Sequence, residues 1–285
     1  MKKKIEKNRF PEMNREYQLL VTDIDGTLLD DNNQVTPKTL EAFQQIKRQD
    51  IKIALATGRF FPDAHHFAKR IAFHCPMILI HGAVIQAFEG SIINQQILPI
   101  ESIPVLLELA QKEEIPYQIF QNDRFIMPRK TKWNDIYLNY SEIEPLIMPD
   151  IVQYLKRHQD IFAFTFLGAP ERLGSMRKKI EEKLNGSVSI ASAHPNVLEV
   201  LAPGVNKGKA IKELASYLDI PLSKVIAIGD NYNDIEMIKM AGLGIAMGNA
   251  PQKVKDAATY ITMDNNHDGI AHFISTLLSH QSDRQ

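Results

Sequence analysis

The chain has 285 residues, of which 44% are hydrophobic and 24% charged, and its formal net charge is -1. This length exceeds one typical domain, so we expect two domains or one domain with an insertion. The near-neutral charge gives no electrostatic case for nucleic acid or an anionic membrane as a partner. No apolar run reaches the ~18 residues that a membrane-spanning helix needs, and we expect a cytoplasmic protein.

Residues 1–16 are predominantly polar and predict a flexible tail. The first four residues carry positive charge, but no apolar segment of a signal peptide follows them. Glu6, Glu12 and Glu16 favour a solvated tail over a basic arm that binds nucleic acid. Cys75 is the single cysteine, so it has no internal disulfide partner, and we expect a buried structural thiol rather than a nucleophile.

The part of the chain after the tail alternates strands and helices. An apolar run begins at Leu19, and Thr36-Pro37 then has the N-cap and first-turn residues of a helix. Next come a strand, a helix and a strand, expected at 51–56, 62–71 and 77–80. Such alternation with short connections predicts a doubly wound α/β fold with parallel strands.

The pattern changes after residue 84 to hairpins mixed with helices. Glu89-Gly90 and Asn122-Asp123 have the residues of hairpin turns. We expect strands at 84–88, 92–98, 117–120, 125–127, 161–167, 188–191 and 197–201, and helices at 104–112, 133–140, 151–158 and 171–184. This order predicts an α+β unit with an antiparallel sheet. Its aromatic residues are expected to form a core, with a ligand site as the alternative.

The α/β alternation returns at Lys207. Helices are expected at 209–218, from 235 to 240, after 250 and at 269–278, with strands at 225–228, 244–247 and 260–262. The fold class is therefore α/β, with a Rossmann-like core of parallel strands and an inserted α+β domain.

Two aspartates follow the first apolar run at once. A strand carried through Asp23 and Asp25 would aim both carboxylates to the same side. There they repel each other unless a proton or a cation lies between them. Taken alone, this stretch is equally well explained as a strand that ends in an acidic turn.

Three further polar clusters follow in the chain. Thr57-Gly58 ends the second strand, Asp230 and Asp234 follow the strand at 225–228, and Lys207 begins a helix. Because ligands of open parallel sheets bind at the carboxyl ends of the strands, the four clusters favour one shared site over chance.

The residue types of these clusters indicate a particular chemistry. Several carboxylates without a paired histidine or cysteine favour Mg²⁺ over Zn²⁺. A lysine, a threonine hydroxyl and a glycine N–H are donors suited to phosphate oxygens. A carboxylate can also serve as a nucleophile and form an aspartyl-phosphate. The clusters together predict phosphoryl transfer.

The same clusters resemble a known family. The chain is similar to the haloacid-dehalogenase superfamily and, within it, to the Cof-type phosphatases with a large α/β cap (class IIB). The resemblance rests on Asp-Ile-Asp-Gly-Thr-Leu at 23–28, Thr-Gly-Arg at 57–59, Lys-Gly at 207–208, Gly-Asp-Asn-Tyr-Asn-Asp at 229–234, Ala-Met-Gly-Asn-Ala at 246–250 and Asp-Gly-Ile at 268–270. One departure lies at His81-Gly82-Ala83, where the family often has Asn-Gly-Ala.

The resemblance implies roles for the reacting residues. Asp23 would be the nucleophile that takes the phosphoryl group. Asp25 would protonate the leaving oxygen and later activate water. Thr57, Gly58 and Lys207 would bind the transferred phosphoryl group.

It also implies a metal site. Asp23, the backbone carbonyl of Asp25, and Asp230 would bind Mg²⁺. Asp234 would be a further ligand, or would hold the ligands in place without binding the metal itself. Asn233 would help to hold the phosphate or Lys207.

The inserted domain has a predictable place. Too few residues separate Asp23 from Thr57 for a domain, whereas the stretch from Thr57 to Lys207 holds the whole α+β unit. We therefore expect a core at 17–86 and 201–285 and a cap at 87–200, which determines substrate specificity and excludes water.

The predicted function is hydrolysis of a small phosphomonoester, such as a sugar phosphate or a phosphorylated cofactor or nucleotide. The alternatives are a phosphotransferase or phosphosugar mutase on the same core, and a sensor that binds a phosphorylated ligand without turnover. Asn122, Asp123, His194 and Glu199 are weak candidates for substrate contact, and His81 is expected to make a structural hydrogen bond or to touch substrate. Protein partners and oligomeric state are not predicted.

Overall fold

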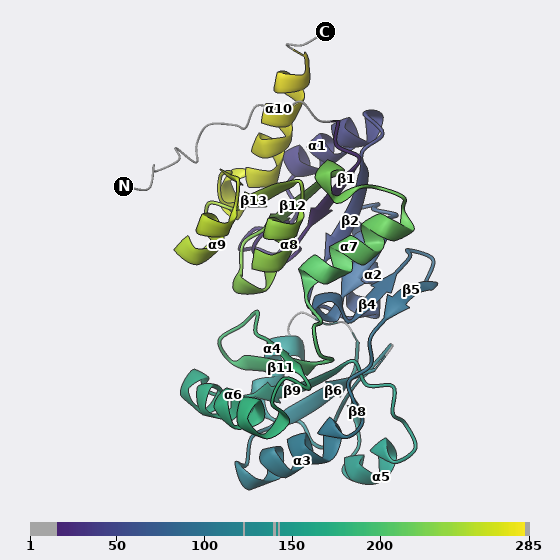
Figure 1. Cartoon of the computed structure of the whole chain (residues 1–285), viewed down its shortest axis with the longest axis vertical. Helices are drawn as coiled ribbons and strands as arrows, with labels where there is room; N and C mark the ends of the chain where they lie inside the picture. Colours follow the sequence, from purple (N-terminus) through teal and green to yellow (C-terminus); the bar gives the residue numbers. More distant parts are fainter. Residues whose placement is uncertain (1–15, 122, 139–140, 142, 283–285) are drawn as a thin grey trace. The chain divides into compact units, whose positions relative to one another are not determined.

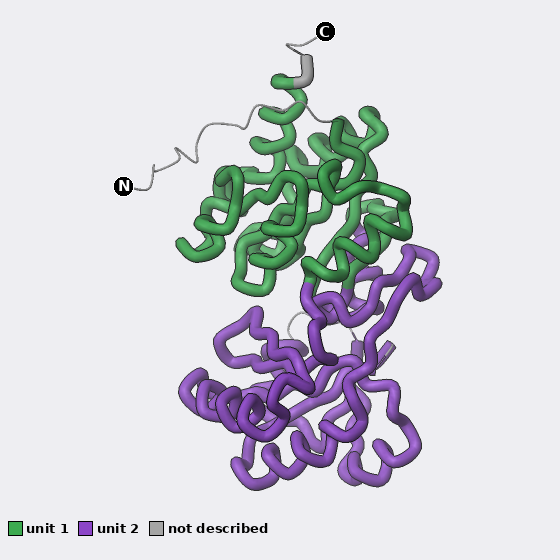
Figure 2. Tube along the Cα trace, in the orientation of Figure 1, with its two compact units in different colours: residues 1–57, 71–78, 207–285 green, residues 58–70, 79–206 purple. Residues whose placement is uncertain are grey.

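A computed structural model of the chain describes residues 16–121, 123–138, 141 and 143–282 (Figure 1). Nearly all of the predicted tail lies outside these residues, as does Asn122, which the sequence predicts at a hairpin turn. The chain divides into two compact units (Figure 2), one of residues 1–57, 71–78 and 207–285 and one of residues 58–70 and 79–206. The second unit thus includes residues 58–70, 79–86 and 201–206, which the sequence-based boundaries assigned to the core.

The first unit contains a sheet of six parallel strands. Its order is β14-β13-β12-β1-β2-β3. The strands are β1 (Leu19–Thr22), β2 (Lys52–Ala56), β3 (Met77–Leu79), β12 (Val225–Gly229), β13 (Leu243–Ala246) and β14 (Tyr260–Ile261). All residues of β1 and β12 are buried, as expected for central strands of a parallel sheet covered on both faces. The predicted parallel core is confirmed.

Five helices accompany this sheet in the described part of the unit. They are α1 (Pro37–Arg48), α7 (Lys207–Tyr217), α8 (Ile235–Met240), α9 (Gln252–Ala257) and α10 (Gly269–Ser282). Helix α1 packs against α10, and α7 packs against α8. Short 3-10 turns lie at Leu222–Lys224, Tyr232–Asp234 and Asn265–His267.

Helix α1 shows how the local sequence determines an element. The hydroxyl of Thr36 accepts a hydrogen bond from a backbone N–H of the first turn, and Pro37 occupies that turn. Phe43 and Ile46 are buried on the face toward the core. The predicted start of this helix is confirmed.

The second unit contains a six-stranded sheet in the order β10-β11-β9-β6-β7-β8. Its strands are β6 (Tyr117–Phe120), β7 (Phe125–Met127), β8 (Leu146–Ile147), β9 (Ala163–Leu167), β10 (Ser189–Ala191) and β11 (Val197–Leu201). The predicted sheet was wholly antiparallel, and this is wrong for one pair, because β7 and β8 run parallel. Strand β8 has two residues, too few to show a pattern in the sequence.

The helices of this unit are α2 (Phe61–Arg70), α3 (Ser102–Lys112), α4 (Asp135–Leu138), α5 (Ile151–Leu155) and α6 (Pro170–Leu184). A hairpin of β4 (Val84–Gln86) and β5 (Ile92–Gln95) confirms the first predicted hairpin, and 3-10 turns lie at Ile80–Gly82 and Lys132–Asn134. Side chains of α3 and α6 form an apolar core with one face of the sheet, which includes Ile119, Phe164 and Val200. Phe120 and Phe125 are also buried, so these two aromatic residues serve as core.

The other face of this sheet carries a row of buried polar side chains. Gln118 of β6 is paired in register with Thr165 of β9, and Thr165 is paired with Glu199 of β11. Each of the three is at most 2% exposed. Since residues directly opposite each other point to the same face, these side chains form a continuous polar line across three strands.

Cys75 is the buried thiol that the sequence predicts. Its side chain is 5% exposed, and burial raises the pKa of the thiol to about 12. The thiolate, which is the nucleophilic form, is therefore absent near neutral pH.

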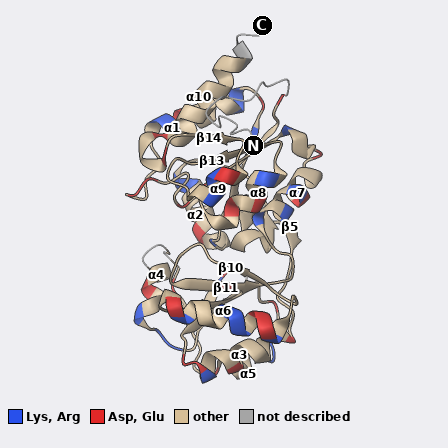
Figure 3. Cartoon of the chain, turned by 60° about the vertical axis from the view of Figure 1, so that its left-hand side comes forward, with Lys and Arg blue, Asp and Glu red and all other residues tan. Residues whose placement is uncertain are grey.

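Charged side chains of both signs are distributed over the helices (Figure 3), in keeping with the net charge of -1. Within the described residues, no helix combines the length and the hydrophobicity required to cross a membrane.

Candidate active site

Strand β1 ends at Thr22, one residue before the first aspartate. The N–H of Asp23 donates to the carbonyl of Ile228 in β12 (3.0 Å), and the N–H of Ile24 donates to Oδ1 of Asp23 (2.7 Å). Asp23 is 5% exposed and Ile24 is fully buried, whereas Asp25 is exposed on the turn that follows. The strand is not carried through the two aspartates, so strand alternation does not determine where their carboxylates point.

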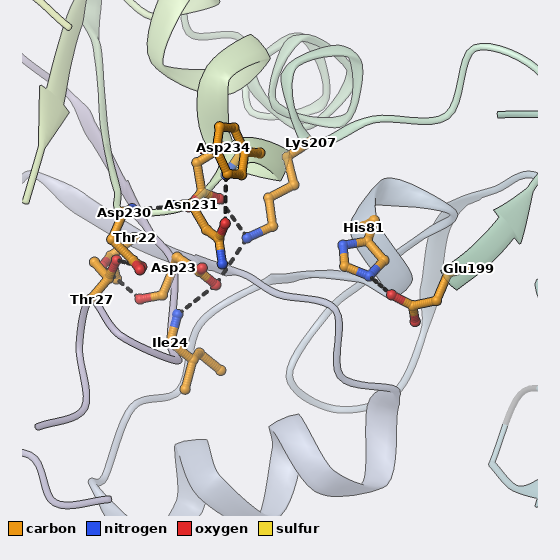
Figure 4. Close-up of polar contacts among 11 residues, drawn as sticks. Thr22, Asp23, Ile24, Thr27, His81, Glu199, Lys207, Asp230, Asn231 and Asp234 are labelled. Atoms are coloured by element: carbon orange, nitrogen blue, oxygen red, sulfur yellow. Dashed lines mark hydrogen bonds and ion pairs between the residues drawn. The ribbon is translucent and has the colours of Figure 1, made fainter. Parts of the chain in front are cut away.

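Lys207 lies between two of the carboxylates (Figure 4). Its Nζ is 2.9 Å from Oδ1 of Asp23 and 2.7 Å from Oδ1 of Asp234. Lys207 and Asp234 are fully buried. Lys207 is the first residue of α7, two residues before the range predicted for this helix, so the start of the helix positions the ammonium group. A buried ammonium group needs such partners, because without them desolvation would displace its proton.

Asp230 follows β12 directly and is 8% exposed. Its Oδ1 accepts a hydrogen bond of 2.5 Å from the hydroxyl of Thr27. Gly26 has a φ of +79°, and a Cβ at this position would lie 2.6 Å from Oδ2 of Asp230. Only glycine fits both the left-handed backbone and the close carboxylate.

Asp234 has both carboxylate oxygens occupied by donors of the protein. Oδ1 accepts from Lys207, and Oδ2 accepts from the backbone N–H groups of Asp230 (3.0 Å) and Asn231 (2.9 Å). Asp234 therefore connects the lysine to the loop that carries Asp230. This arrangement favours the anchoring role of Asp234 over that of a metal ligand.

Burial and the charges of neighbouring groups shift the pKa values of these residues. Burial raises the pKa of Asp23 well above its usual value, and the charge of Asp234 raises it further, while Lys207 lowers it. Burial and then the charge of Asp234 raise the pKa of Asp230 to about 7. For Lys207, burial lowers the pKa, but the charges of Asp23 and Asp234 outweigh it and the net pKa is raised. The lysine stays charged, and three ionised carboxylates would carry more negative charge than one lysine balances.

This excess of negative charge fits a cation. One carboxylate oxygen each of Asp23, Asp230 and Asp234 lie within 4.8 Å of one another. The donor set consists of oxygen atoms only, which is what Mg²⁺ prefers. The residues present therefore fit the metal that the sequence predicts. A bound cation would relieve the mutual repulsion that, after burial, raises the carboxylate pKa values.

The remaining predicted residues lie as follows. Thr57 is fully buried just beyond β2, and its N–H donates to the carbonyl of Ile78 (2.8 Å). Because β2 is the neighbour of β1, Thr57 and Asp23 lie at the same end of adjacent parallel strands. Asn233 lies in the 3-10 turn Tyr232–Asp234. Gly58 belongs to the second unit and contacts His81 there.

The weak candidates for substrate contact have diverse surroundings. Asp123 is exposed and pairs with its neighbour Arg124 (2.9 Å). His194 is exposed, and burial of part of its ring lowers its pKa. Glu199 is buried and contacts His81, which confirms the structural hydrogen bond expected of that histidine.

Sequence reasoning assigned no role to Thr27 or Asn249. Thr27 bonds Asp230, as described above, and the side chain of Asn249 donates to the carbonyl of Gly26 (2.8 Å) and accepts from the N–H of Asn265 (3.2 Å). Asn249 thus holds the turn that presents Asp25. Both residues lie inside motifs that carry the resemblance, and this position in the sequence is what could have indicated a role for them.

The comparisons with known proteins agree with this site. A family model described as haloacid dehalogenase-like hydrolase matches residues 20–274. The chain belongs to this family. This match confirms the predicted family. Together with the relatives described next, it also confirms the prediction that the protein is an enzyme, a phosphatase of the haloacid-dehalogenase type.

Two relatives of this chain are named phosphatases. The chain is 30% identical over 269 residues to the putative phosphatase YxeH of Bacillus subtilis, covering 92% of this chain and 98% of that protein. It is 27% identical over 258 residues to 5-amino-6-(5-phospho-D-ribitylamino)uracil phosphatase YcsE of the same organism, covering 90% and 94%. The structure of the subclass IIB sugar phosphatase BT4131 matches with a TM-score of 0.79 at 24% identity, covering 91% and 98%. This match confirms the predicted fold.

Proposed function

We propose that the protein is a Mg²⁺-dependent phosphatase that hydrolyses a small phosphomonoester through an aspartyl-phosphate on Asp23. The observation that carries this proposal is the fully buried Lys207 held between Asp23 and Asp234, with Asp230 beside them. A lysine and a carboxylate cluster at the end of a parallel sheet suit the charge of a phosphoryl group and the nucleophile that attacks it.

The reaction takes two steps. The carboxylate of Asp23 attacks phosphorus, the bond to the leaving oxygen breaks, and Asp25 gives that oxygen a proton. Asp25 then takes a proton from water, whose oxygen attacks phosphorus and releases Asp23 and inorganic phosphate. The exposed turn position of Asp25 suits this exchange of protons with substrate and water.

The other groups hold the phosphoryl oxygens. Lys207, the hydroxyl of Thr57 and the N–H of Gly58 would donate to them, and Asn233 would help to orient Lys207 or the phosphate. Asp23, Asp230 and the backbone carbonyl of Asp25 would bind Mg²⁺, with Asp234 behind them. When bound, the metal supplies positive charge that balances the phosphoryl oxygens.

The substrate class is a small phosphorylated metabolite, a sugar phosphate or a phosphorylated cofactor or nucleotide. The name of the relative YcsE, a phosphatase of a phosphorylated ribitylaminouracil, supports this class. We propose that the cap predicted at 87–200 selects the substrate, and that the enzyme acts in the cytoplasm.

The function is tested by release of inorganic phosphate. We expect turnover of p-nitrophenyl phosphate and of at least one member of a panel of phosphorylated metabolites. Activity should disappear with EDTA and return with Mg²⁺. Binding of phosphate without any turnover would indicate the sensor instead, and transfer of phosphate to an added sugar would indicate the phosphotransferase.

Binding of Mg²⁺ should strengthen as the pH rises through about 7. The pKa of Asp230 is about 7 in the folded protein, above its usual 3.8. The folded state of the metal-free protein therefore loses stability as the pH rises from 3.8 to about 7. Mg²⁺ binds the ionised carboxylate and reverses that loss. Thermal melting with millimolar MgCl₂ should therefore show a larger rise in Tm at about pH 8 than at about pH 5.5. Asp230→Asn should lose most of this rise, and an equal rise at both pH values would contradict the assignment.

A further inference from the structure

A buried histidine and a buried glutamate of the second unit contact each other outside the carboxylate cluster (Figure 4). Nε2 of His81 lies 2.5 Å from Oε2 of Glu199, and their side chains are 2% and 3% exposed. Glu199 lies on β11, at the end of the polar row formed with Thr165 and Gln118. With Glu199 ionised, Nε2 of His81 is the donor of this hydrogen bond.

Glu199 is itself held in place. The hydroxyl of Tyr137 donates to its other oxygen, Oε1, over 3.3 Å. Burial, and next the charge of Glu199, raise the pKa of Tyr137 well above its usual value, so the phenol keeps the proton that it donates. The carboxylate therefore has a donor on each oxygen, as a buried charge requires.

The ring of His81 packs against a glycine. A Cβ built on Gly58 would lie 2.6 Å from Cε1 and 2.7 Å from Nε2 of His81. The backbone next to it is also bound, because the N–H of Ile80 donates to the carbonyl of Arg59 (3.0 Å). The segment of Gly58 and Arg59 is thus held by the segment of Ile80 and His81 at two points.

The backbone that carries His81 is strained. Ile80, His81 and Gly82 have φ values of 48°, 56° and 106° in succession. Positive φ is rare for any residue with a Cβ and is a true outlier for a β-branched one. Such a conformation persists only where the surroundings hold it, and it is common next to functional sites. The hydrogen bond to Glu199 is one contact that holds this turn.

We propose that His81 is a positioning residue that holds the backbone of Gly58 in the conformation that binds the phosphoryl group, and that Glu199 holds His81 in turn. The proposal rests on the proposed function, in which the N–H of Gly58 donates to the substrate. Glu199 on β11 is thereby linked through one imidazole ring to a phosphate-binding residue. A ring displaced from Gly58 would leave that N–H misdirected, and a misplacement of about 1 Å costs about 100-fold in rate.

Three variants separate the hydrogen bond of His81 from its bulk. His81→Gln keeps a donor near the position of Nε2, His81→Leu keeps bulk without a donor, and Glu199→Gln keeps an acceptor without the charge. The matched control is Gln118→Leu, which changes a buried polar residue of the same sheet face that bonds Asn134; the atoms nearest to a Cβ built on Gly58 belong to His81.

The probe is inorganic phosphate with Mg²⁺, measured by calorimetry and as an inhibitor of p-nitrophenyl phosphate hydrolysis. We expect His81→Leu to weaken phosphate binding and to raise KM by about tenfold or more, with a further fall in kcat. His81→Gln should recover most of the affinity, and Gln118→Leu should bind phosphate as the wild type does. Unchanged binding in His81→Leu, or equal losses in His81→Leu and His81→Gln, would overturn the proposal.

A double-mutant cycle tests the link to Glu199. The loss of phosphate affinity in His81→Leu/Glu199→Gln should not exceed the larger of the two single losses, because one change removes the donor and the other the acceptor charge of the same connection. Losses that add would show that the two residues act independently and would overturn the link. If His81→Leu does not fold, as judged by near-ultraviolet circular dichroism, Glu199→Gln is compared with Gln118→Leu instead. We then expect weaker phosphate binding in Glu199→Gln, and binding equal to that of Gln118→Leu would overturn the link.

The proposed function fails in a different way. A wild-type protein that neither hydrolyses any phosphomonoester nor binds phosphate would contradict the phosphatase itself. A wild type that does both, with a His81→Leu variant that behaves identically, would contradict only the role of His81.

Discussion

Replacing Asp23 by asparagine should reduce hydrolysis of p-nitrophenyl phosphate by at least about 10⁴-fold, the scale of losing a nucleophile. Asparagine keeps the shape of the side chain and an oxygen that accepts the N–H of Ile24, but its amide does not attack phosphorus. Steady-state assays with saturating Mg²⁺ measure this loss. Activity within about tenfold of the wild type would contradict the role of Asp23 as nucleophile.

The same substitution should leave the fold intact. The pKa of Asp23 is raised in the folded protein, first by burial and then by Asp234. At neutral pH its ionised form therefore costs stability in the metal-free protein, and an uncharged isostere removes that cost. We expect a Tm of metal-free Asp23→Asn at or above that of the wild type. Asp50→Asn is the matched control, since Asp50 is exposed and its φ of 58° suits asparagine equally well.

Replacing Lys207 by methionine should destabilise the protein by about 3–5 kcal/mol, the cost of breaking a buried ion pair by removing one partner. Methionine fills much of the volume but leaves Asp23 and Asp234 without the charge that Nζ supplies at 2.9 and 2.7 Å. Activity should fall by about 10³-fold or more, because the charge that faces the phosphoryl group is lost. Denaturant unfolding without metal measures the stability, and phosphate release measures the activity.

Two further variants make this prediction specific. Lys209→Met removes a charge from an exposed position of the same helix and should change both quantities little. Asp23→Asn/Lys207→Met should be more stable than Lys207→Met alone, because one of the two uncompensated carboxylates is gone. A double variant that is less stable than Lys207→Met alone would contradict the assigned ion pair.

Most elements of the core follow from local sequence. Thr36 and Pro37 mark the start of α1, and fully apolar runs mark β1 and β12 as buried parallel strands. These signals are local, since a cap, a fixed φ and a hydrophobic run act within a few residues. Strand β8 was not predicted, because two residues show no periodicity. Its parallel pairing with β7 depends on a partner distant in the chain.

The residues of the candidate site were also predictable. Asp23, Lys207, Asp230 and Asp234 were predicted from motif and order alone, and the structure brings their side chains together. Sequence reasoning did not predict where the side chains of Asp23 and Asp25 point. Strand alternation does not orient Asp23 and Asp25, because the backbone turns after Thr22 to bury Ile24.

The sequence by itself determined the fold class, the family, and which residue types gather at the ends of the strands, because these depend on local patterns and on the order of motifs. Only the tertiary structure decided that Lys207 joins Asp23 to Asp234, that Thr27 bonds Asp230, and that His81 pairs with Glu199. Each of these contacts joins residues far apart in the chain. Their formation depends on burial, since a charged or polar group removed from water needs a partner that only the folded chain brings within reach.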